Sequence, residues 1–297
     1  MIPSPEADAA RGWVERAWRS ADGLVLSARD YPGAAGLARL PVICLHGLTR
    51  NARDFEEVAP RLAASGRRVL ALDVRGRGRS ARDPQPMNYV VPTYATDVAA
   101  LAAQAGIARA VFVGTSMGGL ITMALATAAP MLVAAAVLND IGPEIGATGL
   151  ARIGRYAGGD APVADWPAAA AYARAINAAA FPHYGDAEWD AFARRLFNDA
   201  QGRPVLDYDP AIAEPMRAAQ GQPTPDLWPL FDTLAKHRPL LLVRGETSDI
   251  LEAQVAERMV ERADRLRLVT LPGVGHAPML TEPEAMDALL TFLAEVD

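Results

Sequence analysis

Short apolar runs recur along this chain of 297 residues, and they constrain its fold more than any other feature of the sequence. Each run is five or six residues long and is rich in valine, leucine and alanine. Strands that are apolar along most of their length are buried on both faces, as in parallel sheets. The six runs are 42–46, 69–74, 110–114, 134–139, 240–245 and 266–271. They predict a largely parallel sheet at the centre of the molecule.

Helical patterns lie between these runs. Residues 93–105 end before a glycine, residues 252–262 carry an apolar face, and residues 286–293 have apolar side chains at helical spacing. Alternation of strand and helix predicts a doubly wound α/β fold with helices on both faces of the sheet. Two earlier segments, 13–20 and 23–29, are expected to add an antiparallel start to the sheet.

The alternation stops between residues 144 and 235. No buried-strand run occurs there, and the pattern instead predicts helices such as 168–180 and 187–198. We therefore predict a helical cap over 144–235, inserted into a core formed by 1–143 and 236–297. The second helix carries an apolar stripe, part of which is expected to line a pocket while the rest packs the cap. This stripe comprises Trp189, Phe192, Ala193, Leu196 and Phe197.

Composition excludes some functions. The net charge is −6, whereas a nucleic-acid binder usually presents a basic face. The single cysteine, Cys44, lies in an apolar run, so we expect it to pack in the core. One cysteine permits no disulfide within the chain, which fits a reducing, cytoplasmic compartment. Residues 1–13 show neither the basic start nor the apolar run of a signal peptide.

Residues 110–139 contain no charged side chain and are long enough to suggest a membrane-spanning helix. Gly114, Gly118, Gly119 and Pro130 interrupt this stretch, so a strand, a helix and a second strand explain it better. We expect a small-molecule substrate, with neither a membrane nor a nucleic acid as partner. The sequence leaves open whether the protein is a monomer or a homodimer.

The stretch GTSMGG at 114–119 follows one predicted strand and precedes an alanine-rich helix. It matches G-x-S-x-G, in which a serine nucleophile lies on a tight turn between strand and helix. Glycines are needed on either side because the turn leaves no room for side chains. The following helix N-terminus would favour negative charge near Ser116. The alternative is that Ser116 is an ordinary helix cap.

A serine hydroxyl needs a base, and the base needs an orienting carboxylate. His276 lies in the glycine-rich loop between the last predicted strand and the last helix, at the edge of the sheet where ligands bind. Asp249 follows strand 240–245 and gives the chain order serine, aspartate, histidine. We predict Asp249 as the carboxylate. Asp140, which follows the preceding strand, and Glu246 are its competitors.

Acyl transfer also needs donors for the oxyanion. The backbone N–H of Met117, directly after the serine, is one expected donor. The other is the N–H of Leu48, in the loop after strand 42–46, which His46 is expected to shape. Arg50, beside this loop, is a candidate substrate contact, with a solvated surface arginine as the alternative.

Four stretches, LHGLTR, DVRGRGRS, GTSMGG and GVGHAP, together resemble the α/β-hydrolase superfamily in the family's order. The resemblance implies an eight-stranded sheet, a helical cap after the sixth strand and a triad of Ser116, Asp249 and His276. It also implies oxyanion donors at Leu48 and Met117. GTSMGG is similar to the corresponding stretch of 3-oxoadipate enol-lactonases and related small esterases. DVRGRGRS resembles the family's turn after strand four, and we expect it to be a solvated loop without a nucleotide site.

These residues predict a serine hydrolase of carboxylic esters or lactones, acting through an acyl-enzyme on Ser116 and requiring no metal or organic cofactor. Epoxide hydrolases and haloalkane dehalogenases of the superfamily have aspartate at this turn, so the serine argues against both. One alternative is hydrolysis of a carbon–carbon bond in a ring-cleavage product, whose carboxylate would need a cation such as Arg50. Another is a non-catalytic binding module on the same fold.

Overall fold

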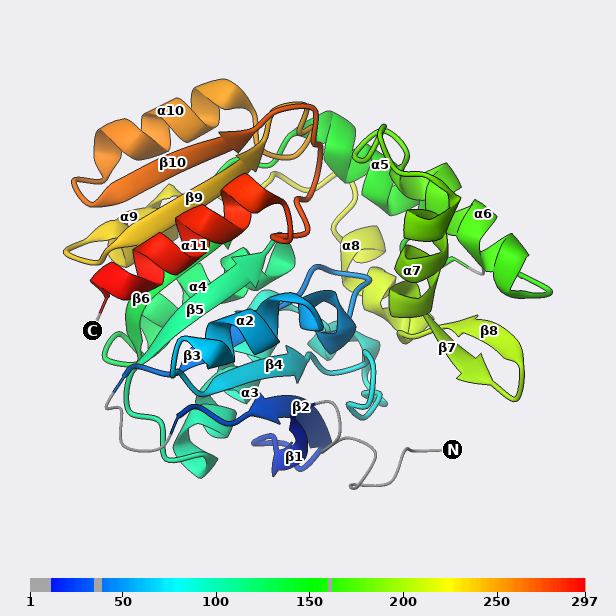
Figure 1. Ribbon diagram of the computed structural model, residues 1–297, viewed down its shortest axis with the longest axis horizontal. Coiled ribbons are helices and arrows are strands. Elements are labelled where there is room, and N and C mark those ends of the chain that lie inside the picture. Colours follow the sequence, from blue (N-terminus) through cyan, green and yellow to red (C-terminus); the bar gives the residue numbers. More distant parts are fainter. Residues whose placement is uncertain (1–11, 35–38, 160–161, 297) are drawn as a thin grey trace.

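Eight strands form one sheet in the computed structural model, which describes residues 12–34, 39–159 and 162–296 (Figure 1). The prediction that residues 1–13 are not a signal peptide concerns mainly residues 1–11, which lie outside the described residues. Along the sheet the order is β1-β2-β4-β3-β5-β6-β9-β10. The strands are β1 (Val14–Arg19), β2 (Val25–Tyr31), β3 (Val42–Leu45), β4 (Val69–Asp73), β5 (Ala110–Thr115), β6 (Val133–Asn139), β9 (Leu240–Gly245) and β10 (Leu266–Leu271).

The sheet is mostly parallel, as the sequence predicts. β2 pairs antiparallel with both β1 and β4, and every other pairing in the sheet is parallel. The antiparallel start predicted from 13–20 and 23–29 is thereby confirmed. In a parallel sheet the carboxyl ends of the strands lie at one edge. The loops that follow β3, β5, β6 and β9 therefore meet there, beside the helices drawn at the right of Figure 1.

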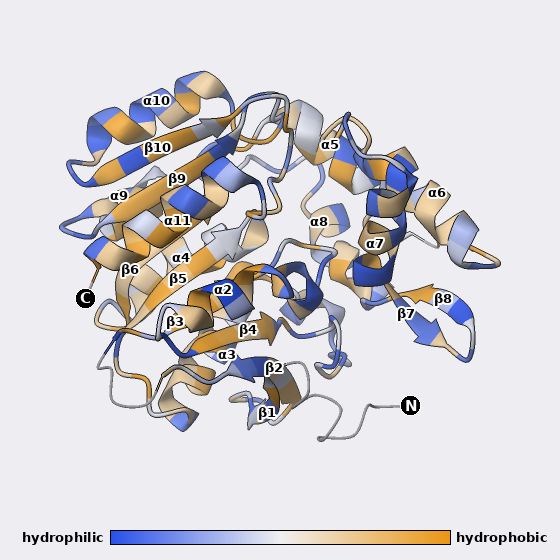
Figure 2. Ribbon diagram, viewed as in Figure 1, coloured by the Kyte–Doolittle hydropathy of each residue, from blue (hydrophilic) through white to orange (hydrophobic). Residues whose placement is uncertain are grey.

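Helices cover both faces of the sheet (Figure 1). Strand side chains alternate between the two faces, so that Ile43 and Leu45 join one buried cluster while Val42 and Cys44 join the other. Cys44 is fully buried, as expected. Figure 2 shows the hydrophobic residues concentrated on the central strands and on the helix sides that meet them. One face is covered by α3 (Val91–Gln104), α4 (Met117–Ala128), α9 (Trp228–Ala235) and α10 (Ala253–Arg262), the other by α2 (Val58–Ala64) and α11 (Pro283–Glu295).

Between β6 and β9 the chain leaves the sheet and forms a separate group of short elements beside its carboxyl edge (Figure 1). The two predicted helices are present as α6 and α7. A two-stranded hairpin, β7-β8, was not predicted, because its short strands are largely exposed and carry no apolar run. Gln201 and Gly202 turn the hairpin with positive φ angles of 58° and 85°. The elements are α5 (Ala147–Tyr156), α6 (Trp166–Asn177), α7 (Asp186–Leu196), β7 (Phe197–Ala200), β8 (Arg203–Leu206) and α8 (Glu214–Ala218).

The predicted apolar stripe packs α6, α7 and the hairpin together, with four of its residues on α7 and Phe197 at the start of β7. All five predicted stripe residues are buried in one cluster with Ala169 and Ala173 of α6. Helix α9, at the end of the predicted cap range, instead packs against α4 through Phe231 and Leu234, which belong to the core cluster. Helix α9 therefore packs with α4 and the sheet rather than with α6 and α7.

The uncharged stretch 110–139 forms β5, α4 and β6, in agreement with the strand–helix–strand interpretation. Throughout the described ranges, no helix combines the length and the apolar character needed to cross a bilayer.

Candidate active site

Ser116 lies on a sharp turn between β5 and α4. It has φ 52° and ψ −114°, in the left-handed region of φ that favours glycine. The neighbouring glycines allow this turn for a steric reason. A Cβ at Gly114 would overlap the backbone of Gly118, and a Cβ at Gly118 would overlap the backbone of Leu45. The serine is thus held at the N-terminus of α4, where the helix dipole favours negative charge.

The predicted base lies beside the serine. Nε2 of His276 is 2.9 Å from Ser116 Oγ, and Nδ1 of the same ring is 2.8 Å from Oδ2 of Asp140. With its Nδ1–H donated to Asp140, a neutral His276 leaves Nε2 free to accept the serine proton. The geometry is that of a nucleophile, a base and an orienting carboxylate.

Asp140, and not the predicted Asp249, contacts His276. Asp140 directly follows β6, the neighbour of β5 in the sheet, and is fully buried. Its Oδ1 accepts the Gly245 N–H at 2.9 Å, and its Oδ2 accepts the Ser248 hydroxyl at 2.6 Å. The loop after β9 therefore supports the carboxylate through Ser248 instead of supplying it.

Asp249 binds Arg152 of α5 instead. Its carboxylate accepts two hydrogen bonds from this guanidinium, at 2.7 and 2.8 Å, and Arg152 lowers the pKa of the carboxyl. The Asp249 carbonyl also accepts the Gly149 N–H, which fixes the loop against α5. Glu246, the other competitor, accepts the Gly273 N–H at 2.8 Å and takes no part in the contact with His276.

The loop after β3 carries the predicted donor Leu48. His46 shapes this loop as expected, because its Nδ1 lies 2.7 Å from the Gly47 carbonyl oxygen and its Nε2 accepts the Val74 N–H. Burial lowers the pKa of His46 to about 4, so the ring is neutral at neutral pH and donates from Nδ1. The loop also places Leu48 on the cavity wall with Ser116.

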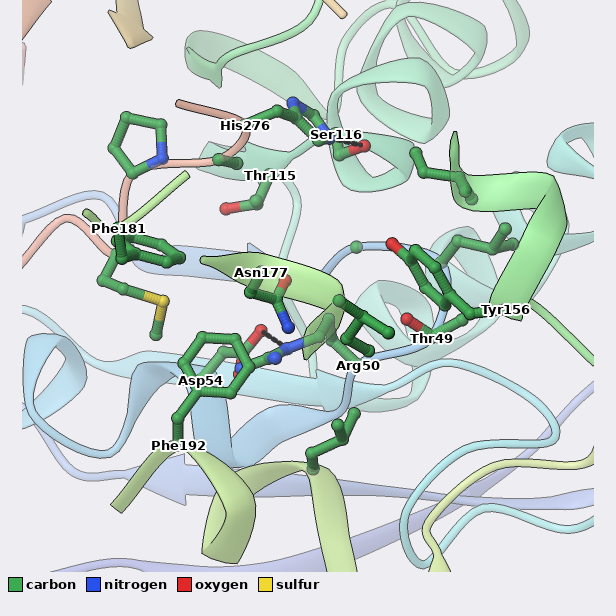
Figure 3. Close-up of a pocket in the computed structure, with 18 of the residues that line it drawn as sticks. Thr49, Arg50, Asp54, Thr115, Ser116, Tyr156, Asn177, Phe181, Phe192 and His276 are labelled. Carbon is green, nitrogen blue, oxygen red and sulfur yellow. Dashed lines mark hydrogen bonds and ion pairs between the residues drawn. The ribbon is translucent and has the colours of Figure 1, made fainter. Parts of the chain in front are cut away.

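A cavity opens between the sheet edge and the cap helices (Figure 3). Arg50 and Asp54 lie across this cavity from Ser116 and His276 and bind each other, with Arg50 Nε 2.9 Å from Asp54 Oδ2. The Arg50 guanidinium also stacks over the ring of Phe192, 4.1 Å from its centroid. The predicted candidate Arg50 therefore lines the cavity and is not a solvated surface arginine. The apolar walls come from Ile153, Ile176, Phe181, Phe192, Leu196 and Met279.

Loop 73–80 was expected to be solvated, but two of its arginines are buried. Arg75 and Arg77 are each only 1% exposed. Arg75 binds Asp97 and Asp83 in a buried ion-pair network, and Arg77 donates to the Leu48 carbonyl at 2.9 Å. The sequence provided no signal for this burial, because arginines between glycines are usually exposed.

Three polar residues of the cavity were also missed from the sequence. Asp54 follows Arg50 by four residues, a spacing that favours an ion pair on a helical turn and could have suggested the contact. Tyr156 and Asn177 come from α5 and α6, and their position depends on how the cap folds over the sheet. Across the part of the chain that the structure describes, no three His, Cys, Asp or Glu side chains form a metal-binding group.

Comparisons with known proteins agree with the fold. A family model described as the alpha/beta hydrolase family matches residues 42–289. The chain is 35% identical over 254 residues to a 3-hydroxybutyrate-oligomer hydrolase of Cupriavidus necator, which covers 82% of this chain and 84% of that protein. It is 28% identical over 260 residues to a 2-(acetamidomethylene)succinate hydrolase of Mesorhizobium japonicum, with 85% and 87% covered. A crystal structure of an alpha/beta hydrolase from Novosphingobium aromaticivorans superposes with a TM-score of 0.89 and 48% identity, over 96% of this chain and 99% of that one.

Asparagine substitutions distinguish the two carboxylates. Asp140→Asn should lower kcat by about 10⁴-fold, because an amide no longer holds His276 in the tautomer that accepts the serine proton. Asp249→Asn should lower kcat/KM less than about tenfold, since a partly exposed ion pair contributes at most about 1 kcal/mol. Steady-state kinetics of both variants on the same ester measures this. Equal losses, or a larger loss for Asp249→Asn, would contradict the assignment of Asp140.

His46 predicts an acid-sensitive part of the folding stability. Its pKa is about 4 in the folded chain and 6.5 when unfolded, so between these values the unfolded chain binds more protons and stability rises with pH. This residue should cost about 3 kcal/mol of unfolding free energy as the pH falls from 7.5 to 4. Urea titrations at both pH values compare the wild type with His46→Asn, which lacks this contribution. If both proteins lose the same free energy on acidification, the neutral buried state of His46 is wrong.

Proposed function

We propose that this chain, which belongs to the alpha/beta hydrolase family, is a serine hydrolase that cleaves a carboxylic ester or lactone of a small, largely apolar molecule. The observation that carries the proposal is the hydrogen-bonded series Ser116–His276–Asp140, whose serine faces the cavity. A binding module would not need a base held on a serine by a buried carboxylate. The arrangement therefore supports catalysis over mere binding.

The proposed reaction has two halves. Ser116 Oγ attacks the carbonyl carbon while His276 Nε2 takes its proton, and the backbone N–H groups of Leu48 and Met117 stabilise the oxyanion. The carbon–oxygen bond to the alcohol then breaks, and His276 gives the proton to the leaving oxygen. Water attacks the acyl-enzyme by the same route and frees the acid and the serine. Asp140 stabilises the imidazolium that forms twice in this cycle.

The cap is proposed to select the substrate. We propose that residues 144–235 act as a cap on the core of 1–143 and 236–297, with α9 joined to the core side by its packing. Helices α5, α6 and α7 contribute Ile153, Ile176, Phe192 and Leu196 to the apolar wall, so the acyl or alcohol group next to the carbonyl should be apolar.

Arg50 is proposed to contact the substrate through its remaining nitrogen. Among the described residues, its hydrogen bonds to Asp54 use only Nε and Nη2, which leaves Nη1 to donate to a substrate oxygen. The pairing with Asp54 already balances the Arg50 charge, which supports an uncharged acceptor such as a hydroxyl or a second ester carbonyl.

The relative from Cupriavidus necator supports the choice of bond. A 3-hydroxybutyrate oligomer, which that protein's name gives as its substrate, is joined by ester bonds. Next to a given ester it carries either another ester carbonyl or the terminal hydroxyl. Short oligoesters of hydroxy acids are therefore the ester substrates we propose to test first.

Ser116→Ala should lower kcat on p-nitrophenyl butyrate by about 10⁴-fold or more, because the attacking oxygen is lost. A fluorophosphonate should label wild-type Ser116 and leave the variant unlabelled, as peptide mass spectrometry would show. The substrate panel adds longer p-nitrophenyl esters, a lactone, a 3-hydroxybutyrate dimer and a ring-cleavage dienoate. Turnover that survives Ser116→Ala, or a preference for the dienoate over every ester, would contradict the proposal.

A further inference from the structure

We propose that Arg77 is a positioning residue for the oxyanion site, acting through Leu48 and Met117. The inference rests on the proposed ester hydrolysis, which makes the N–H groups of those two residues the oxyanion donors. It goes beyond that function by assigning a role to the buried arginine of the RGRG turn, which the triad does not use.

The turn that carries Arg77 is built so that its side chain points inward. Gly76 and Gly78 on either side have φ angles of 75° and 53°, which a residue with a side chain rarely adopts. A Cβ at Gly76 would press on the Tyr89 ring. The turn is also tied to the segment after β8, because the Gly78 N–H donates to the Asp207 carbonyl at 2.9 Å.

The planar guanidinium of Arg77 contacts both predicted oxyanion residues. Its Nε donates to the Leu48 carbonyl oxygen at 2.9 Å, and its Nη2 lies 3.6 Å from the sulfur of Met117. Its Nη1 donates to the Arg75 carbonyl at 2.7 Å and to the Tyr94 hydroxyl at 2.9 Å. Four contacts from one rigid group fix the distance between the loop after β3 and the start of α4.

Arg77 and His46 together fix the direction of the Leu48 N–H. This N–H belongs to the peptide group whose carbonyl is that of Gly47, and this carbonyl accepts the His46 Nδ1–H at 2.7 Å. The next peptide group carries the Leu48 carbonyl, which Arg77 holds. The Leu48 N–H lies in the first of these two planes, and because the planes on both sides of the Leu48 Cα are held, this N–H has one orientation.

The charge of Arg77 has no acidic partner among the residues that the structure describes. Arg75, two residues earlier, binds Asp97 and Asp83, whereas the hydrogen bonds of Arg77 go to carbonyls, a hydroxyl and a sulfur. A buried cation without a carboxylate is costly to fold. The oxyanion on the substrate carbonyl would form one residue away, on the N–H groups of Leu48 and Met117 that Arg77 contacts through other atoms. A positive charge at that remove favours the transition state over the bound ester.

Three variants test this role. Arg77→Met removes the donors and the charge, Arg77→Lys keeps a buried charge without the planar contacts, and Arg79→Met is a matched control in the same turn. Arg79 binds Glu15 near the surface and does not line the cavity. Each variant is assayed for kcat and KM on p-nitrophenyl butyrate, and for inhibition by a trifluoromethyl ketone, which adds to Ser116 as a tetrahedral oxyanion. Thermal unfolding monitors the fold.

Arg77→Met should lower kcat about ten- to a hundredfold with KM within about threefold, because outright loss of an oxyanion donor costs about 10²- to 10³-fold and Arg77 acts one step removed. Affinity for the trifluoromethyl ketone should fall by the same factor. Arg77→Lys should recover part of both losses, and Arg79→Met should change neither. Should Arg77→Met fail to fold, Arg77→Lys carries the test, since a lysine cannot hold Leu48 and Met117 together.

Two results would overturn the inference. One is folded Arg77 variants with wild-type kcat. The other is a loss of kcat with unchanged affinity for the trifluoromethyl ketone, which would indicate a structural effect elsewhere. Failure of the proposed function would look different, because the wild type itself would then show no turnover dependent on Ser116.

Discussion

The close approach of α4 to β3 is the constraint on which the candidate site depends. Gly118, in the first turn of α4, lies against the backbone of Leu45, the last residue of β3. A side chain at position 118 would push the helix away and move Ser116 with it. Because β3 and β5 are paired with Leu45 opposite Gly114, the loop after β3 begins beside the serine turn. Leu48 and Ser116, the residue before α4, therefore line the same cavity.

The sequence predicts most of the fold because local patterns determine it. The strand runs are apolar on both faces, and the helices between them each have one apolar face. A parallel sheet with helices packed on both of its faces buries all of these apolar surfaces. The serine and histidine were predicted for a similar reason, since a strand end places each at the same sheet edge. The β7-β8 hairpin was not predictable in this way, because its strands carry no apolar run.

The orienting carboxylate required information that spacing does not contain. Asp140 and Asp249 both follow strands that end at the same edge, so either satisfies the pattern. The order of strands decides between them, because β6 is the neighbour of β5 and β9 lies one strand further away. Arg152 then decides the role of Asp249, and this residue comes from a cap helix whose position no local pattern gives.

The surroundings of three arginines could not be predicted from local sequence either. Arg50, Arg75 and Arg77 appear in loops, where an arginine is usually solvated, yet each is enclosed by groups distant in the sequence. Two of them are balanced by aspartates, and Arg77 by hydrogen-bond acceptors alone among the described residues. Burial of this kind depends on tertiary structure. Through it, Arg50 contacts Phe192 of α7, and Arg77 contacts the loop after β3 and the start of α4.

The central claim is that Ser116, His276 and Asp140 act with the Leu48 and Met117 N–H groups on one carbonyl. A crystal structure of the protein inactivated by a fluorophosphonate tests it most directly. The account predicts phosphorus bonded to Ser116 Oγ, with a phosphoryl oxygen about 2.7–3.1 Å from both backbone nitrogens and His276 still bound to Asp140. Phosphorus bonded to another residue, or a phosphoryl oxygen directed away from Leu48 and Met117, would contradict it.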